Sequence, residues 1–241
     1  MQDRLSSDEQ VYEIKKTVLK SPVIFAGFVG AGLVGPLAIG YMIDKLKMKE
    51  IGYIRSRHLP PSTVFMQGRL RHPFRLHSNK DGTICGIICE ITLPFGLYDI
   101  VNTILDWAEK KGSHEIVILD GVASASHDNK AFCAAEEDLC RVMEDNDISM
   151  IPQGFITGVA GGLLNECLVR KIQGVTLLVK ANDKGPDPLA AATLVDAVNR
   201  AYGMNIDTSD LRKKKNQIGA DFKELSDKYT EHRKIDSNMY M

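Results

Sequence analysis

Several features that would point directly to a function are missing from this chain of 241 residues. Its five cysteines contain no C-x-x-C pair, so neither a zinc finger nor a disulfide framework is expected. The sequence has no G-x-x-x-x-G-K-[S/T] loop, so we expect no use of ATP. The net charge is -1, which gives no overall positive field to attract nucleic acid or anionic lipid. Nucleic-acid binding is therefore disfavoured.

Long hydrophobic runs are also absent. The longest apolar stretch, Val23 to Met42, is interrupted by glycines and by Pro36, and is interpreted as a strand, a turn and a helix. The first residues, Met1 to Leu5, lack the basic and then apolar layout of a signal peptide. We therefore expect a cytoplasmic protein with reduced cysteines and no membrane association.

Hydrophobic patterns indicate strands that alternate with helices along most of the chain. Short continuous apolar runs are typical of strands buried on both faces. Such patterns predict strands at 22–29, 51–54, 64–66, 74–77, 84–91, 115–120, 154–158 and 175–180. Helices are predicted from the first glycine-rich turn to about 47, at 98–111, at 131–146, from the turn 158–162 to 170, and at 188–202. Segment 10–19 is compatible with a helix or an edge strand. The whole is interpreted as one α/β domain, residues 1–206, followed by a C-terminal helix and flexible tail, residues 207–241.

Local signals mark the ends of two helices. Asp187 is predicted to be an N-cap, with Pro188 at the first helical position. Asp207 is predicted to cap the final helix, with Asp210 in its first turn. Apolar residues then recur at helical spacing on an otherwise charged segment. They are Ile218, Phe222, Leu225 and Tyr229.

The segment Gly30-Ala-Gly32-Leu-Val-Gly35 follows a predicted buried strand and precedes a helix. Backbone amides in this position can hold a phosphate, as they do in dinucleotide-binding proteins. The acidic residue that such proteins carry after the next strand is missing, because Ile54 is followed by Arg55-Ser-Arg57. Three interpretations remain: a structural turn, a nicotinamide site, or a site for another anion or ligand.

Asp120 is predicted at the carboxyl end of a strand, where α/β sheets commonly bind ligands. It could bind a metal, act as a base, or cap the following loop. The letters of a hydrolytic triad follow it, but neighbours in sequence do not have the geometry of a triad. These residues are Ser124, Ser126, His127 and Asp128. We find no complete catalytic set and predict that the protein is not an enzyme.

The cysteines are interpreted as core residues. Cys85 and Cys89 share one strand face at a distance of about 13 Å, too far apart to bind one metal ion. Cys133 and Cys140 are predicted on one face of a helix, and Cys167 in the core.

The last three residues, Met239-Tyr-Met241, place an apolar side chain, a tyrosine and a carboxylate at the end of a charged tail. Such an end suits capture in a partner's pocket, which can bury the ring, bond the hydroxyl and pair with the carboxylate. The alternative is an unused terminus. About a dozen residues follow the apolar stripe, and fully extended they could reach about 40 Å beyond the body at about 3.3 Å per residue.

Three motifs, in this order, resemble the PAC2 family of proteasome assembly chaperones, and its archaeal members in particular. They are Gly27–Gly35, Thr157–Glu166 and Pro186–Ala191, and Ile206–Leu211 fits the family's C-terminal region. The resemblance implies a mixed sheet flanked by helices, similar to the purine nucleoside phosphorylase-like fold, and a homo-oligomer between a trimer and a pentamer. It implies a scaffold and not a catalyst, and the histidine and acid set of a working phosphorylase is not found here.

Some members of that family end in a hydrophobic–tyrosine–any residue (HbYX) motif that inserts between α-subunits of the 20S proteasome. By this resemblance Met239 would fill an apolar groove, the hydroxyl of Tyr240 would bond to backbone, and the carboxylate of Met241 would pair with a lysine. We therefore expect a non-catalytic, ATP-independent proteasome assembly chaperone or activator without a cofactor or metal. The alternative is an enzyme or binding protein that uses Gly30–Gly35 and Asp120 on a nucleoside-like or phosphorylated small molecule.

Overall fold

The computed structural model describes residues 9–14, 17–66, 68–93, 97–125 and 128–213. Its strands are β1 Gln10–Glu13, β2 Val23–Gly27, β3 Lys49–Arg55, β4 Val64–Met66, β5 Arg69–Arg71, β6 Phe74–Ser78, β7 Ile84–Cys89, β8 Glu115–Ala123, β9 Ala131–Ala135, β10 Ser149–Met150 and β11 Gln173–Ala181. Its helices are α1 Val34–Lys45, α2 Leu97–Lys110, α3 Glu137–Glu144, α4 Gly158–Arg170, α5 Pro188–Tyr202 and α6 Ser209–Lys213.

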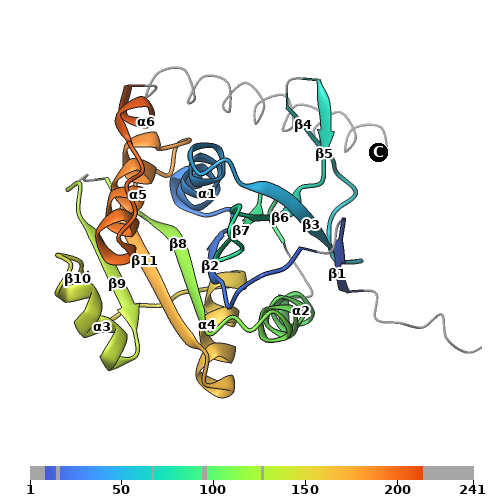
Figure 1. The fold of residues 1–241 in the computed structure, drawn as a ribbon. Helices are drawn as coiled ribbons and strands as arrows, with labels where there is room; N and C mark the ends of the chain where they lie inside the picture. The colour runs from blue at the N-terminus through green and yellow to red at the C-terminus, as the bar shows by residue number, and fades with distance from the viewer. Residues whose placement is uncertain (1–8, 15–16, 67, 94–96, 126–127, 214–241) are drawn as a thin grey trace, which may run out of the picture.

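Within the described residues, nine strands form one mixed sheet in the order β1-β3-β6-β7-β2-β8-β11-β9-β10 (Figure 1). The four central strands, β7, β2, β8 and β11, are mutually parallel. β6, β3 and β1 continue the sheet on one side by antiparallel pairing, and β9 pairs antiparallel with β11 on the other. β4 and β5 form a separate two-stranded sheet that projects from the body.

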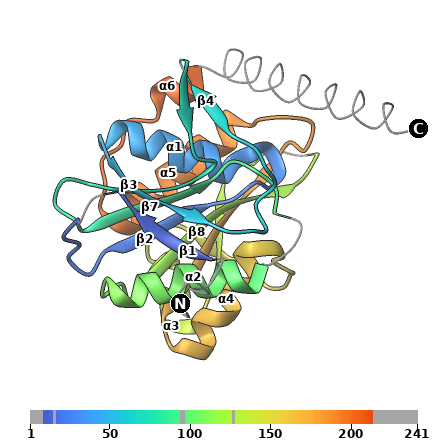
Figure 2. The same ribbon diagram turned by 90° about the vertical axis from the view of Figure 1, so that its right-hand side faces the viewer.

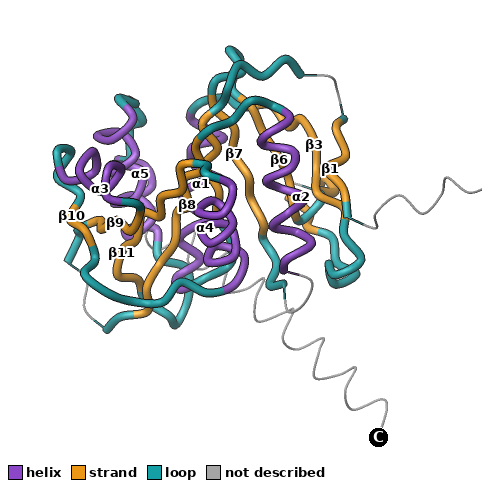
Figure 3. Tube along the Cα trace, turned by 90° about the horizontal axis from the view of Figure 1, so that it is seen from below, coloured by secondary structure: helices purple, strands orange, loops and turns teal. Residues whose placement is uncertain are grey.

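Helices cover both faces of the sheet. α1 and α5 pack together on one face, and α2 and α4 on the other, as Figure 2 shows. Figure 3 views the molecule from the side of α2 and α4. Residues of the central strands alternate between the two hydrophobic cores: Phe25 and Val117 face α1 and α5, whereas Ile24 and Ile116 face α2 and α4. Burial on both faces explains why these strands are continuously apolar in sequence.

The expected fold class, a mixed sheet flanked by helices, is confirmed. α5 has the predicted bounds, and the ambiguous segment 10–19 contains β1 at the edge of the sheet. The likeness to the phosphorylase-like fold and the division of the chain at residue 206 stay predictions. Among the described residues no helix combines the length and the apolar character that crossing a bilayer requires.

Two predicted elements are wrong. The helix predicted at 131–146 is a strand, β9, followed by the shorter helix α3, so Cys133 and Cys140 lie on different elements. The strand predicted at 154–158 is a loop that ends in the first residue of α4. Two further strands, β5 and β10, were not predicted. Apart from the loop at 154–158, these differences concern strands of the sheet's last portion or of the projecting hairpin, where pairing partners and not local pattern decide the structure.

Candidate functional site

The glycine-rich segment between β2 and α1 packs directly on β8. A Cβ atom added to Gly27 would lie 2.4 Å from the carbonyl oxygen of Gly35, and one added to Gly35 would lie 2.5 Å from that of Leu119. Real Cβ atoms do not approach so closely, so α1 can lie this near the sheet only because both residues are glycines. These two glycines therefore have a packing role that needs no ligand.

The other two glycines of the motif face acidic residues. A Cβ atom on Gly30 would lie 2.4 Å from Oδ1 of Asp120. Gly32 has a φ of +62°, in the left-handed region, and a Cβ atom there would lie 2.9 Å from the Cβ of Asp187. The structure thus places the glycine loop and Asp120, the two parts of the predicted ligand site, side by side.

Asp120 lies inside β8, which continues to Ala123, and not at its last residue. Its Oδ1 accepts a hydrogen bond of 2.8 Å from the backbone N–H of Gly121. Burial raises the pKa of this carboxyl group, and the bond from Gly121 opposes that shift. An ionised Asp120 would repel a phosphate held at Gly30, whereas the raised pKa favours the neutral carboxyl group.

An open hollow of about 490 Å³ lies at the carboxyl ends of β8 and β11. Its lining comes from two loops: Ala123, Ser124, Ala125, Asn182, Asp183 and Lys184. The hollow borders the glycine loop, because the carbonyl oxygen of Asn182 lies 3.0 Å from the position of a Cβ on Gly32. This is the part of the described structure that a small molecule could enter near the motif.

The triad letters after Asp120 do not form a triad among the described residues. Asp128 is ion-paired with Lys180 at 2.7 Å, whereas residues 126 and 127 lie outside the described part of the chain.

The five cysteines are all free and buried, as predicted. Burial raises the pKa of Cys85 and Cys89 to about 12, which keeps these thiols protonated and unreactive.

Asp187 joins three segments behind the glycine loop. Its Oδ1 accepts from the N–H of Ala190 at 3.0 Å, which confirms the predicted N-cap of α5. Its Oδ2 accepts from the N–H of Asn182 at 3.0 Å, and its own N–H donates to the carbonyl of Gly32 at 2.8 Å. The carboxylate therefore ties the start of α5 to the loop after β11, and the backbone N–H of the same residue bonds the glycine loop.

The segment leading to the C-terminus is anchored on α1 and α5. The side chain of Asn199 bonds both backbone groups of Ile206, at 2.8 and 2.9 Å. Lys45 of α1 pairs with Asp210 of α6 at 2.6 Å, and Leu211 is 2% exposed. The chain therefore leaves the body next to α1 and α5, at a defined place.

Asp207 bonds the N–H of Ser209 at 2.9 Å, so it acts at the start of α6 as predicted. The rest of the predicted tail, residues 214–241, lies outside the described residues. The apolar stripe and the predicted proteasome-binding residues Met239, Tyr240 and Met241 are in this part, so their roles stay predictions.

The chain combines a mixed sheet, a glycine loop packed closely against it and an anchored α6. It is therefore an α/β protein in which glycines of the motif allow α1 to pack closely on the sheet. Comparison with known families agrees with the motifs found in the sequence. The sequence profile of the PAC2 family matches residues 24–226, and the chain belongs to the PAC2 family.

Solved structures with this fold include several from archaea. A protein of unknown function from Thermoplasma acidophilum is 32% identical, with a TM-score of 0.83 over 90% of this chain and 91% of that one. Pyrococcus furiosus PbaA, an archaeal homolog of proteasome-assembly chaperone, is 25% identical, with a TM-score of 0.82 over 93% of this chain and 99% of that one. Pyrococcus furiosus PbaB, an archaeal proteasome activator, is 20% identical, with a TM-score of 0.79 over 92% of this chain and 100% of that one.

Proposed function

We propose that this chain is a non-catalytic, ATP-independent assembly chaperone or activator of the proteasome. It binds the α-subunits of the 20S particle through its C-terminal residues Met239, Tyr240 and Met241. The observation that carries the proposal is the similarity to PbaA, which extends over 93% of this chain and 99% of that protein. The fold shared with PbaB is consistent with it.

The anchored base of the tail supports a docking role. Because Lys45 and Asp210 hold α6 to the body, 28 residues (214–241) are left between the last described residue and the carboxylate. If those residues were extended, they could carry Tyr240 tens of ångströms away from α1, at about 3.3 Å per residue. In this proposal the body positions the tail, and the last three residues make the contact with the 20S particle.

Several copies acting together would give the tail useful affinity. A single short peptide end buries little surface and binds weakly, but a homo-oligomer of three to five copies presents several ends at once. Linked ends raise the effective concentration and can increase overall affinity by about 10²–10⁴. Native mass spectrometry of the full chain, alone and with 20S α-subunits, measures the number of copies.

The test is co-purification of the full chain with 20S particles. Y240A is expected to abolish binding, because it removes the ring and the hydroxyl together. Y240F keeps the ring and isolates the hydroxyl, whose loss is expected to cost about 0.5–1.5 kcal/mol, or roughly 2- to 13-fold in affinity. Appending one glycine after Met241 moves the carboxylate and is expected to abolish binding as Y240A does.

N238A serves as the matched control, because it alters the same tail beside the three contact residues and is expected to bind as the unaltered chain does. Undiminished binding of Y240A and of the glycine-extended chain would contradict tail docking. If the unaltered chain itself did not bind 20S particles, the proteasome role as a whole would be contradicted.

A second candidate is binding of a nucleoside-like or phosphorylated small molecule, and the observation that favours it is the hollow of about 490 Å³ beside the glycine loop. A ligand that binds only the folded state must raise the unfolding temperature. Thermal-shift measurements with nucleosides, nucleotides and inorganic phosphate test this candidate, and K184A, which alters the hollow's lining, should remove any shift. No shift with any of these compounds would contradict it.

A further inference from the structure

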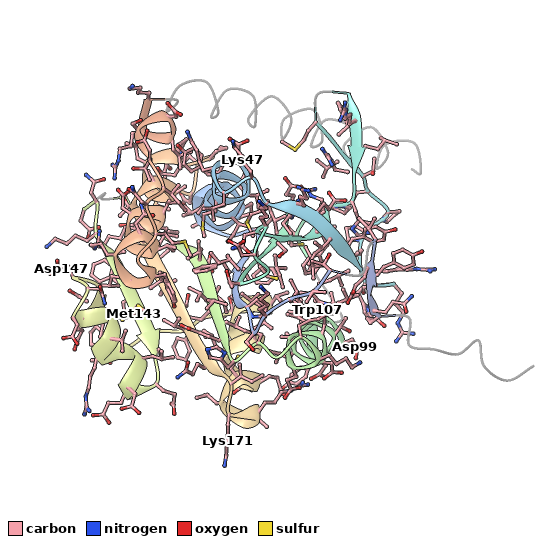
Figure 4. All side chains as sticks on the ribbon, viewed as in Figure 1. Lys47, Asp99, Trp107, Met143, Asp147 and Lys171 are labelled. Carbon is pink, nitrogen blue, oxygen red and sulfur yellow. The ribbon has the colours of Figure 1, made fainter. Side chains whose placement is uncertain are left out.

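Three side chains from distant parts of the sequence meet at the side of the molecule opposite β10. Glu9 immediately precedes β1, His58 follows β3, and Asp99 lies in the first turn of α2 (Figure 4). One oxygen of each carboxylate and Nε2 of the imidazole all lie within 4.8 Å of one another. None of these residues belongs to the glycine loop or to the tail.

Two separations in this cluster, from His58 Nε2 to each carboxylate, match those of ligands around a metal ion. His58 Nε2 lies 3.3 Å from Asp99 Oδ2 and 3.6 Å from Glu9 Oε1. Nitrogen and oxygen ligands bind zinc at about 2.0–2.2 Å, so neighbouring ligands of a tetrahedral ion are about 3.3–3.6 Å apart. A single N–H on Nε2 can point at only one of two acceptors, whereas one cation between the three atoms satisfies all of them.

The surroundings position two of the three ligands. Glu9 has only 8% of its side chain exposed, and its Oε1 accepts a 2.9 Å bond from the hydroxyl of Ser56. The same hydroxyl accepts from the N–H of His58 at 3.0 Å, so Ser56 fixes Glu9 relative to the histidine backbone. Pairing of Gln10 with Arg55 in the β1–β3 ladder sets this alignment, because it brings the preceding residue level with Ser56.

The positively charged side chain of Arg57 lies next to this cluster. The exposed Arg57 places its Nε 3.5 Å from Nε2 of His58, at the limit of a hydrogen bond. The guanidinium therefore lies beside the histidine of a cluster that also holds two carboxylates. Arg57 would have to turn toward solvent when a metal ion binds, and its exposure allows that movement.

We propose that Glu9, His58 and Asp99 bind a divalent transition-metal ion, with zinc as the best match to one imidazole and two carboxylates. Mg²⁺ and Ca²⁺ fit less well, because they prefer oxygen ligands alone. Three protein ligands leave a fourth position for water or for a donor from another molecule. Glu9 and Asp99 also line a groove of about 580 Å³ between β1 and α2, so the fourth position is accessible from that groove.

A bound ion would join the segment before β1, the loop after β3 and the start of α2. The first two segments are already joined by the β1–β3 ladder and by Ser56, whereas side-chain contacts such as the 3.0 Å bond from Trp107 of α2 to Glu13 of β1 connect α2 to this edge. The ion would therefore stabilise this side of the sheet independently of any proteasome contact.

The experiment uses the full-length chain without an affinity tag, stripped of metal by a chelator. Zn²⁺ alone is titrated by calorimetry, and Co²⁺ alone by absorption spectroscopy, in which ligation by imidazole produces visible bands. We expect one ion per chain. H58A removes a ligand and should lower the affinity by more than about 100-fold. S56A removes the hydroxyl that bonds Glu9 and the N–H of His58, and should lower the affinity by roughly 10–100-fold, as for other residues that orient metal ligands.

D99N guards against misfolding as an explanation, since Asp99 has 53% of its side chain exposed and its replacement should leave the metal-free unfolding temperature unchanged. H114A is the matched control, because this histidine is exposed and lies outside the cluster. It should bind metal as the unaltered chain does. The inference is overturned if no ion binds at one per chain, if H58A and D99N both retain the unaltered affinity, or if H114A loses as much as H58A.

Discussion

Replacing Asp187 with alanine should measure how much the tie behind the glycine loop contributes to stability. The change leaves two backbone N–H groups without their acceptor: that of Ala190, which is buried, and that of Asn182, which is partly buried. Loss of an N-cap acceptor costs about 0.5–2 kcal/mol, and loss of a second hydrogen bond about 0.5–1.5 kcal/mol. Because the Ala190 N–H cannot reach water easily, we expect D187A to lower the free energy of unfolding by about 1.5–3.5 kcal/mol.

Urea denaturation followed by circular dichroism is the assay. With a slope of about 3 kcal/mol per molar, the unfolding midpoint of D187A should fall by about 0.5–1.2 M. D187N keeps one carbonyl oxygen for the N–H of Ala190 and should lose only the bond from Asn182, which gives a fall of about 0.2–0.5 M. D183A alters an exposed acid of the same loop and should change the stability by less than about 0.5 kcal/mol.

Two results would refute this reasoning. If D187A unfolded at the same urea concentration as D183A, the two hydrogen bonds of the Asp187 carboxylate would contribute nothing measurable to stability. If D187N were as unstable as D187A, the bond to Ala190 would not be the larger contribution, and the assignment of Asp187 as the N-cap would not explain its burial.

Three further predictions concern other parts of the body. In the same urea assay, G32A should lower the free energy of unfolding by about 1–3 kcal/mol, because the φ of Gly32 is +62° and the added Cβ would lie 2.9 Å from the Cβ of Asp187. G203A should lower it by only about 1 kcal/mol, because Gly203 also has a positive φ but open space surrounds it. The hydroxyl of Tyr202 donates to Glu115 at 2.6 Å, and burial raises the pKa of this hydroxyl above its usual range. The unfolded state therefore releases the tyrosine proton at a lower pH than the folded state, and the free energy of unfolding should fall above about pH 10. Y202F should lack this part of the fall, and a pH profile of Y202F identical to that of the unaltered chain would contradict the prediction. A thiol reagent at pH 8 should label none of the five buried cysteines in the native protein and all five in guanidinium, and rapid native labelling would show that the cores open readily.

Local signals in the sequence predicted those elements whose structure is decided by neighbours in the chain. α5 begins where Asp187 and Pro188 place it and ends at the predicted Tyr202, and the structure shows that the next residue, Gly203, has the positive φ of a helix end. β2 and β8 were recognised because burial on both faces leaves a continuous apolar run. The glycine motif was recognised as well, and Gly35 of this motif packs closely against Leu119 of β8.

The sequence could not show which distant segments meet. Residues 131–135 contain alanine and cysteine, which suit a helix, yet they form β9 because they pair antiparallel with residues 175–179 of β11. Glu9, His58 and Asp99 carry no spacing that suggests a metal site. Only the register of β1 on β3 and the position of α2 bring them together, and neither can be read from local pattern. The predicted binding role of the tail, in contrast, rests on local sequence alone, namely the identity of its last three residues.

The outermost strands of the sheet have a consequence for how copies of this chain can associate. Within the described residues, β1 pairs with β3 along four residues and β10 with β9 along two, and neither has a second neighbour. Unpaired edges template aggregation when they are long, and these offer few free backbone groups to a neighbour. If copies of this chain associate, these two short edges favour contacts through side chains of helices and loops, and subunits joined in that way could separate and exchange without breaking a continuous ladder of backbone hydrogen bonds.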